Sequence, residues 1–233
     1  MLRFIAGLMA LMTVSLTTPV NAQSNLVVVE LYTSQGCSSC PPADALLTKL
    51  AERDDVLALA LHVDYWDYIG WADKFADPAH TVRQRSYAQA LGNRMIYTPQ
   101  MIIGGAAHVV GSKVNDVIDQ IDTERALSSP ITLMLSRNGG RISISASTTE
   151  GRAKPMVVQL VRFDPSETTA ITRGENAGRT IGYTNIVTSW NQVKNWDGSK
   201  PLKISVKAAG TEQVAVIIQS AGFGRILAAA QLQ

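Results

Sequence analysis

The sequence predicts an α/β domain followed by a smaller all-β domain, on three features of its hydrophobic pattern. Two apolar runs, at 26–34 and 56–63, have no helical period, which is typical of strands buried on both faces. The leucines between them have helical spacing. From about residue 129 apolar and polar residues alternate, which is the period of a β-strand. We therefore expect an α/β domain at 23–127 and a β-rich, sandwich-like domain at 128–233.

Residues 1–22 have the features of a secretory signal peptide. Arg3 supplies a positive charge, an apolar stretch follows, and Val20-Asn21-Ala22 has the small-x-small pattern of a cleavage site. The alternative is an uncleaved anchor, but the apolar stretch is shorter than the ~20 residues of a membrane span. We expect a periplasmic or secreted protein with no membrane span after signal cleavage, in a compartment where disulfides persist.

The first elements of the mature chain form a β-α-β unit. The strand "LVVVELYTS" is followed by "CSSC" and then by "PADALLTKLAE", in which proline begins a helix. "VLALALHV" supplies the second strand, and the connection through a helix makes the two strands parallel. Cys37 and Cys40 are thus expected between a buried strand and the start of a helix.

Residues 64–97 read as a helical insertion, with helical stretches near 71–75 and 81–91. Aromatic residues gather at its start, and they would either form a wall that grips an apolar peptide or pack as the buried face of a helix. Trp66 is the aromatic residue that we expect to be exposed and to contact substrate. Arg83 and Arg85 are expected on a solvated face.

Turn residues predict the strands at the end of the first domain and those of the second domain. "TPQMIIGG" and "AHVVG" predict two short strands, and Ser112 is expected to cap a helix that follows them. Asn-Gly-Gly at 138–140 predicts a hairpin, and five further strands follow. The loop "RGENAGRT" (173–180) holds glycines and arginines, which would serve either a ligand or a structural turn with Arg173 paired to Glu175.

The net charge is +2 and no basic run occurs. Nucleic acid is therefore not an expected partner, and no cofactor is expected.

The cysteine pair allows three interpretations. A disulfide across so short a loop contributes only about 2 kcal/mol as a staple. A zinc site needs more ligands, and the chain offers only three histidines besides carboxylates, although two thiolates would suit Cu(I). A reactive pair fits the position best, because a helix amino terminus stabilises a thiolate.

The order of these elements, with C-x-x-C at a helix start and a later Thr-Pro, resembles the thioredoxin fold over about residues 25–127. That resemblance implies a cis bond between Thr98 and Pro99, whose loop faces the cysteines and pairs with substrate backbone. It also implies a buried acid as proton acceptor, a role that Glu30 would take unless it is paired with Lys or Arg. The stretch up to Gly111–Asp116 resembles the glutathione site of glutaredoxins, which makes Ser112 a candidate substrate contact.

Four segments together, "ELYTSQGCSSCPPAD", "HVDYWDYIGW", "YTPQMIIGG" and "RGENAGRT", resemble an uncharacterised family of exported thioredoxin-like bacterial proteins, the domain of unknown function 1223. This resemblance implies a thioredoxin-like fold with a helical insertion, but no substrate.

The sequence thus predicts an exported thiol-disulfide oxidoreductase. Cys37 would attack, Cys40 would resolve, and the pair would form a disulfide when oxidised. Its partners would be protein thiols and disulfides or a small thiol such as glutathione, and the direction of electron flow stays open. The alternatives are a redox-inactive binding protein and a Cu(I) or zinc carrier.

Overall fold

The computed structural model describes residues 26–149 and 154–232. The expected signal peptide therefore lies outside the described residues. The elements in chain order are β1 (Val27–Thr33), α1 (Pro41–Ala51), β2 (Val56–His62), the 3-10 helix η1 (Asp67–Ile69), α2 (Pro78–Ala90), β3 (Gln100–Ile103), β4 (Ala107–Val110), α3 (Val114–Arg125), β5 (Ile131–Asn138), β6 (Arg141–Thr148), β7 (Met156–Ala170), β8 (Thr180–Trp196), β9 (Leu202–Lys207), β10 (Gln213–Ser220) and β11 (Ile226–Leu232).

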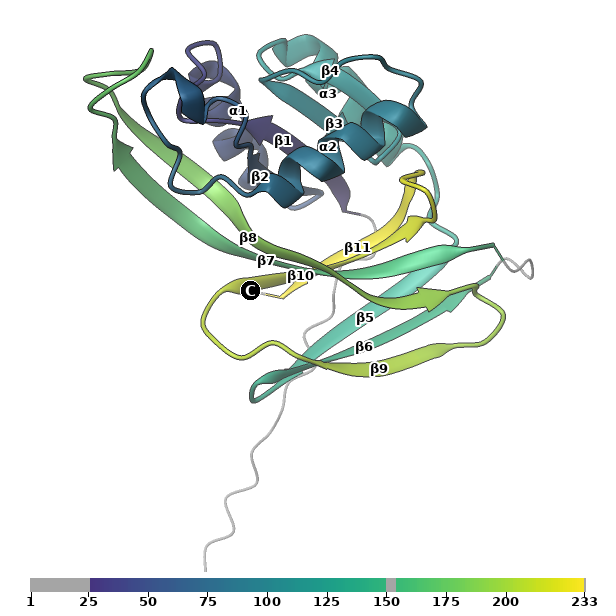
Figure 1. Ribbon diagram of the computed structural model, residues 1–233. Helices are drawn as coiled ribbons and strands as arrows, with labels where there is room; N and C mark the ends of the chain where they lie inside the picture. The colour runs from purple at the N-terminus through teal and green to yellow at the C-terminus, as the bar shows by residue number, and fades with distance from the viewer. Residues whose placement is uncertain (1–25, 150–153, 233) are drawn as a thin grey trace, which may run out of the picture.

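Most of the strands form one mixed sheet of eight, in the order β11-β10-β7-β8-β2-β1-β3-β4. The expected β-α-β unit is confirmed, because β1 and β2 pair in parallel from Val27–Val56 to Thr33–His62. The β5–β6 hairpin is also confirmed, with Asn138 opposite Arg141. In Figure 1 the small sheet β5-β6-β9 lies beneath β7, β8, β10 and β11, while α1 and α3 lie at the opposite end of the molecule.

The expected fold class is wrong. Strands predominate over helices in the described residues, and the second half of the chain does not form a separate small sandwich after a thioredoxin-like domain. Instead β8 pairs in parallel with β2, at Ala60 and Ile186. Four strands of the second half thereby extend the sheet that β1–β4 begin.

The hydrophobic cores follow this arrangement. One lies between α1, α3 and the sheet, around Leu31 and Leu47. A second joins β1, β2 and β3 to β7, β10 and β11, with Phe163 and Tyr87 fully buried in it. The third lies between the two sheets. Because the second core draws on both halves of the chain, the halves bury each other's apolar surface.

The expected helical insertion is also wrong in part. The helix expected near 81–91 exists as α2, but 71–75 is not helical. Tyr68, one of the aromatic residues at the start of the insertion, is 82% exposed and does not belong to a buried helix face. Arg83 is buried rather than solvated, whereas Arg85 is exposed as expected.

Candidate functional site

The cysteines lie at the carboxyl end of β1, as the sequence predicts. Cys40 is the N-cap of α1, and Pro41 and Pro42 occupy the first helical turn, where missing N–H groups cost least. Cys37 and Cys40 form a disulfide with their Cα atoms 5.4 Å apart. The two cysteines are only 1% and 0% exposed, while the serines between them are exposed. The disulfide is thus placed at a helix amino terminus and is almost completely covered.

The loop between β7 and β8 reaches the cysteine loop. The Asn176 side chain donates through Nδ2 to the backbone oxygens of Gln35 and Cys37, at 3.0 and 2.9 Å. Gly174 has a positive φ of 76°, and a Cβ there would lie 3.1 Å from the Trp71 Cβ. In Figure 1 the long β7–β8 hairpin extends from the small sheet to the helical end. The "RGENAGRT" segment therefore holds the CxxC loop through its asparagine.

Trp66 connects the proline loop to the cysteine loop. The Thr98–Pro99 bond is cis, as expected. Trp66 donates through Nε1 to Thr98 Oγ1 at 2.7 Å, and its Cβ lies 3.2 Å from the ideal Cβ position of Gly36. The expected substrate contacts Thr98, Pro99 and Trp66 thus lie together, but Trp66 is half-buried and not exposed as expected.

Ser112 is exposed and follows Gly111, whose N–H donates to Pro99 O at 2.9 Å. The expectation that Ser112 caps the helix is wrong, because Lys113 is the N-cap of α3 and makes no side-chain capping bond.

Glu30 is fully buried in an ion pair. Its carboxylate accepts from Arg83 Nε and Nη2 at 2.7 and 2.8 Å, and from the hydroxyls of Tyr87 and Tyr32 at 2.7 and 2.9 Å. The Trp190 ring lies against the Arg83 guanidinium, with its centroid 3.6 Å from Cζ. Glu30 is therefore paired with an arginine, which is the second of the two roles considered for it. The donors to its oxygens are arginine and tyrosine side chains, and neither cysteine is among them.

Asp44 is a buried acid that sequence reasoning missed. It lies on α1, one helical turn after Cys40, and accepts from Thr33 Oγ1 at 2.8 Å. Burial raises the pKa of its carboxyl to about 7, against the opposing effects of His62 and the Thr33 hydrogen bond. The available signal was an acid at a helix position flanked by apolar neighbours. Asp44 therefore has a pKa suited to exchanging protons near neutral pH.

His62 and Asp73 extend this polar region. The His62 Nδ1 lies 2.7 Å from Asp73 Oδ2, and the same oxygen accepts the Gln35 N–H at 2.8 Å. In the described ranges no group of three or more His, Cys, Asp or Glu side chains has the arrangement of a metal site.

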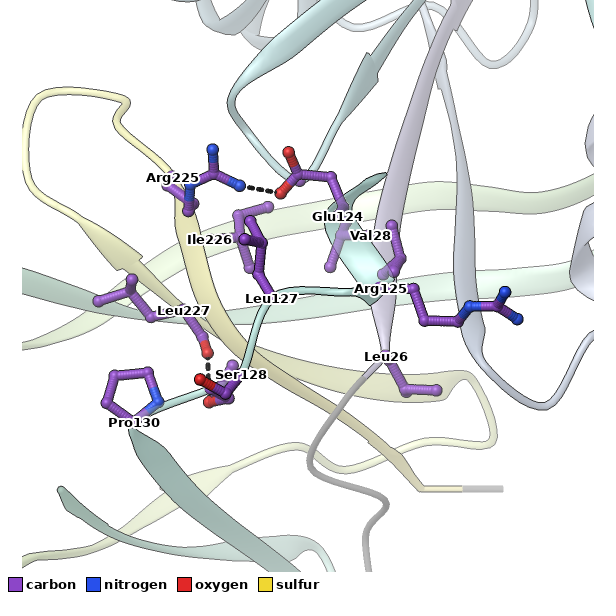
Figure 2. A pocket seen from close by; sticks show the side chains of 14 residues that line it. Leu26, Val28, Glu124, Arg125, Leu127, Ser128, Pro130, Arg225, Ile226 and Leu227 are labelled. Carbon is purple, nitrogen blue, oxygen red and sulfur yellow. Dashed lines mark hydrogen bonds and ion pairs between the residues drawn. The ribbon is translucent and has the colours of Figure 1, made fainter. Parts of the chain in front are cut away.

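A cavity at the other end of β1 is lined by residues of α3, β11 and the start of β1. Figure 2 shows Leu26 and Val28 on one side of it and Arg225 on the other, with Glu124 between them and paired with Arg225. Because β1 runs from this cavity toward the cysteines, the cavity is remote from the disulfide and supplies no group to it.

A sequence profile described as protein of unknown function, DUF1223, matches residues 28–219. The chain belongs to the DUF1223 family. Among solved structures, protein AGR_C_4864 of Agrobacterium tumefaciens is 34% identical to this DUF1223 chain, with a TM-score of 0.76 over 91% of this chain and 96% of that one. HBP35 of Porphyromonas gingivalis is 15% identical, with a TM-score of 0.59 over 90% and 75%, and shares the fold. No curated protein matches.

No helix in the described part of this DUF1223 chain is long and apolar enough to span a membrane.

Proposed function

We propose that this DUF1223 protein is an exported thiol-disulfide oxidoreductase that uses Cys37 and Cys40. The observation that carries the proposal is the position of the disulfide, at the amino terminus of α1 and beside a buried acid of raised pKa. The partial positive charge of the helix dipole at the start of α1 favours a thiolate, while Pro41 and Pro42 supply no N–H groups there. A structural staple would need neither feature.

Cys37 is the attacking residue in this proposal. It precedes the exposed Ser38, whereas Cys40 is completely buried at the start of α1. In the oxidising direction a substrate thiolate bonds to the Cys37 sulfur and the Cys40 sulfur leaves with the electron pair. A second substrate thiolate then displaces Cys37, giving a substrate disulfide and a reduced pair. The reverse sequence reduces a substrate.

The substrates we propose are protein thiols and disulfides or glutathione, in the periplasm or outside the cell. The proline loop supports a peptide-like substrate, because Trp66 fixes Thr98 beside the cysteine loop. We propose that Thr98, Pro99 and Ser112 form the edge along which the substrate backbone lies.

A redox-inactive binding protein is the second candidate, and one observation favours it. Both cysteines are almost fully covered, and Asn176 holds the loop that carries them. Exchange with a protein substrate would require this cover to open.

Trapping separates the two candidates. The full-length chain with Cys40→Ala, expressed in bacteria, should accumulate mixed disulfides at Cys37 that nonreducing electrophoresis detects. The matched controls are Cys37→Ala and the double substitution, which should accumulate none. If Cys40→Ala yields no more adducts than the double substitution, the oxidoreductase proposal fails and the binding protein is preferred.

A further inference from the structure

Four polar side chains form a buried cluster behind the cysteine loop: Asp44, His62, Asp73 and Tyr183. They come from α1, from β2, from the segment before α2 and from β8, and each is 5% exposed or less. The rings of His62 and Tyr183 pack edge-on with centroids 4.8 Å apart. His62 lowers the pKa of the Asp44 carboxyl and Asp73 raises it. The pairing of β2 with β8 thus brings together groups from both halves of the chain.

Three atoms of this cluster have no hydrogen-bond partner among the described residues: Asp44 Oδ2, His62 Nε2 and Tyr183 Oη. Leaving one buried polar atom unpaired costs about 1–3 kcal/mol. Three such atoms in one cluster are unusual in a folded protein. The three atoms make no hydrogen bond to one another, so a water molecule that bridges them would remove this cost. The arrangement therefore indicates a site for proton exchange through water rather than packing alone.

The cluster contacts the cysteine loop from two sides. Cys40 has helical backbone angles, and the Asp44 N–H donates to its carbonyl at 3.1 Å. Residues four apart lie on the same helix face, so the Asp44 side chain follows that of Cys40 along α1. On the other side, Asp73 accepts the Gln35 N–H.

The orientation of His62 is fixed by its neighbours. Asp73 accepts at Nδ1, which leaves Nε2 as the free ring nitrogen. His80 of α2 lies with its Nδ1 2.8 Å from the His62 backbone oxygen, not from its ring. The titratable groups around the imidazole are therefore Asp44, Asp73, Tyr183 and His80, and Asp44 is the one that lies next to Cys40 in α1.

We infer that Asp44 and His62 form a proton-exchange site for Cys40, with Asp73 as the residue that orients His62. This inference rests on the proposed function. When Cys40 resolves a mixed disulfide between Cys37 and the substrate, Asp44 accepts the proton of the Cys40 thiol and exchanges it with His62 Nε2 through a bridging water molecule. The Cys40 thiolate bonds to the Cys37 sulfur, and the substrate leaves Cys37 as a thiolate. In the reverse direction the proton returns to the Cys40 thiolate.

The resolving step can be measured directly in the purified protein. The reduced protein is treated with 5,5′-dithiobis(2-nitrobenzoate), which forms a mixed disulfide at Cys37 and releases one thionitrobenzoate. Attack by Cys40 on this mixed disulfide releases a second thionitrobenzoate, and its visible absorbance is recorded. Single-turnover rates are recorded across neutral and alkaline pH. General-base assistance raises a reaction rate about 10²–10⁴-fold. The Asp44→Asn variant should therefore release the second thionitrobenzoate at least tenfold more slowly at pH 7.

The pH profile separates a proton-exchange role from a structural one. The deficit of Asp44→Asn should close at high pH, where the Cys40 thiol ionises without a base, whereas a packing defect would persist. His62→Gln should slow the release of thionitrobenzoate at pH 7 in the same way. If Asp44→Asn does not fold, His62→Gln is the variant that tests the inference. The matched control is Asp54→Asn, which removes an exposed acid beyond α1 and should leave the profile unchanged.

Each remaining outcome identifies what fails. If the unmodified protein forms no mixed disulfide or releases no thionitrobenzoate, the proposed function fails. If it releases the label and both Asp44→Asn and His62→Gln match it at every pH, the proton-exchange site is refuted and the oxidoreductase proposal stands.

Discussion

The buried carboxyl of Asp44 makes the stability of the oxidised protein depend on pH. Burial raises the pKa of Asp44 to about 7 in the folded protein from an ordinary value of 3.8. The folded state therefore binds this proton more tightly than the unfolded state, and its stability falls as pH rises between about 4 and 7. At about 1.4 kcal/mol per pKa unit, the loss between pH 5 and pH 8 is about 2–3 kcal/mol.

Asp44→Asn removes this loss, because an amide does not ionise and its oxygen still accepts from Thr33. Urea unfolding of the oxidised forms at pH 5 and pH 8 gives the free energy of unfolding at each pH. Between pH 5 and pH 8, the free energy of unfolding of the variant relative to the unmodified protein should rise by about 2–3 kcal/mol. Asp54→Asn is the control and should show no shift. Equal differences at the two pH values, within about 0.5 kcal/mol, would refute the assignment of Asp44 as a buried, neutral-range acid.

Three further predictions concern contacts around the site. Glu30→Gln leaves the Arg83 charge without its carboxylate and should cost about 3–5 kcal/mol in urea unfolding without changing the rate of thionitrobenzoate release; a slowed release would return Glu30 to the chemistry. Asn176→Ala removes two hydrogen bonds to the cysteine loop and should speed reduction of the disulfide by dithiothreitol at least tenfold, at a stability cost of about 1–3 kcal/mol; an unchanged rate would show that the β7–β8 loop does not restrict access. Trp66→Phe removes the hydrogen bond to Thr98 and should slow exchange with a reduced protein substrate but not with dithiothreitol; equal slowing with both would contradict a substrate-positioning role.

The sequence predicts the local features well because each depends on neighbouring residues. The strands around Val27 and Val56 follow from β-branched and apolar runs, and proline at position 41 marks the start of α1. The cis bond before Pro99 was implied by the family resemblance and not by the residues alone.

The joining of the two halves was not predicted, and the reason lies in β7 and β8. β7 continues through the polar segment Asp164–Ala170, which contains a proline and reads as a loop, and β8 begins opposite this segment. Together they carry the hairpin past β2, where β8 pairs with it. A period-two pattern gives no information on a partner strand over a hundred residues away.

Separation along the sequence also limits how much of the site can be predicted. The pairing of Glu30 with Arg83 joins residues 53 apart, and Asn176 reaches Cys37 across 139. Tyr183 meets His62 only because β8 lies beside β2. Sequence reasoning therefore located the Cys37–Cys40 disulfide but found neither the Arg83 partner of Glu30 nor the buried carboxyl of Asp44.

The reduction potential of the Cys37–Cys40 pair tests the central claim most directly. The mature protein is equilibrated in graded mixtures of reduced and oxidised glutathione or dithiothreitol, and the thiols are counted by alkylation and mass spectrometry. Our account predicts a potential between about −270 and −120 mV, the range of proteins that exchange disulfides. A potential below about −300 mV would identify a structural disulfide and contradict the proposed function.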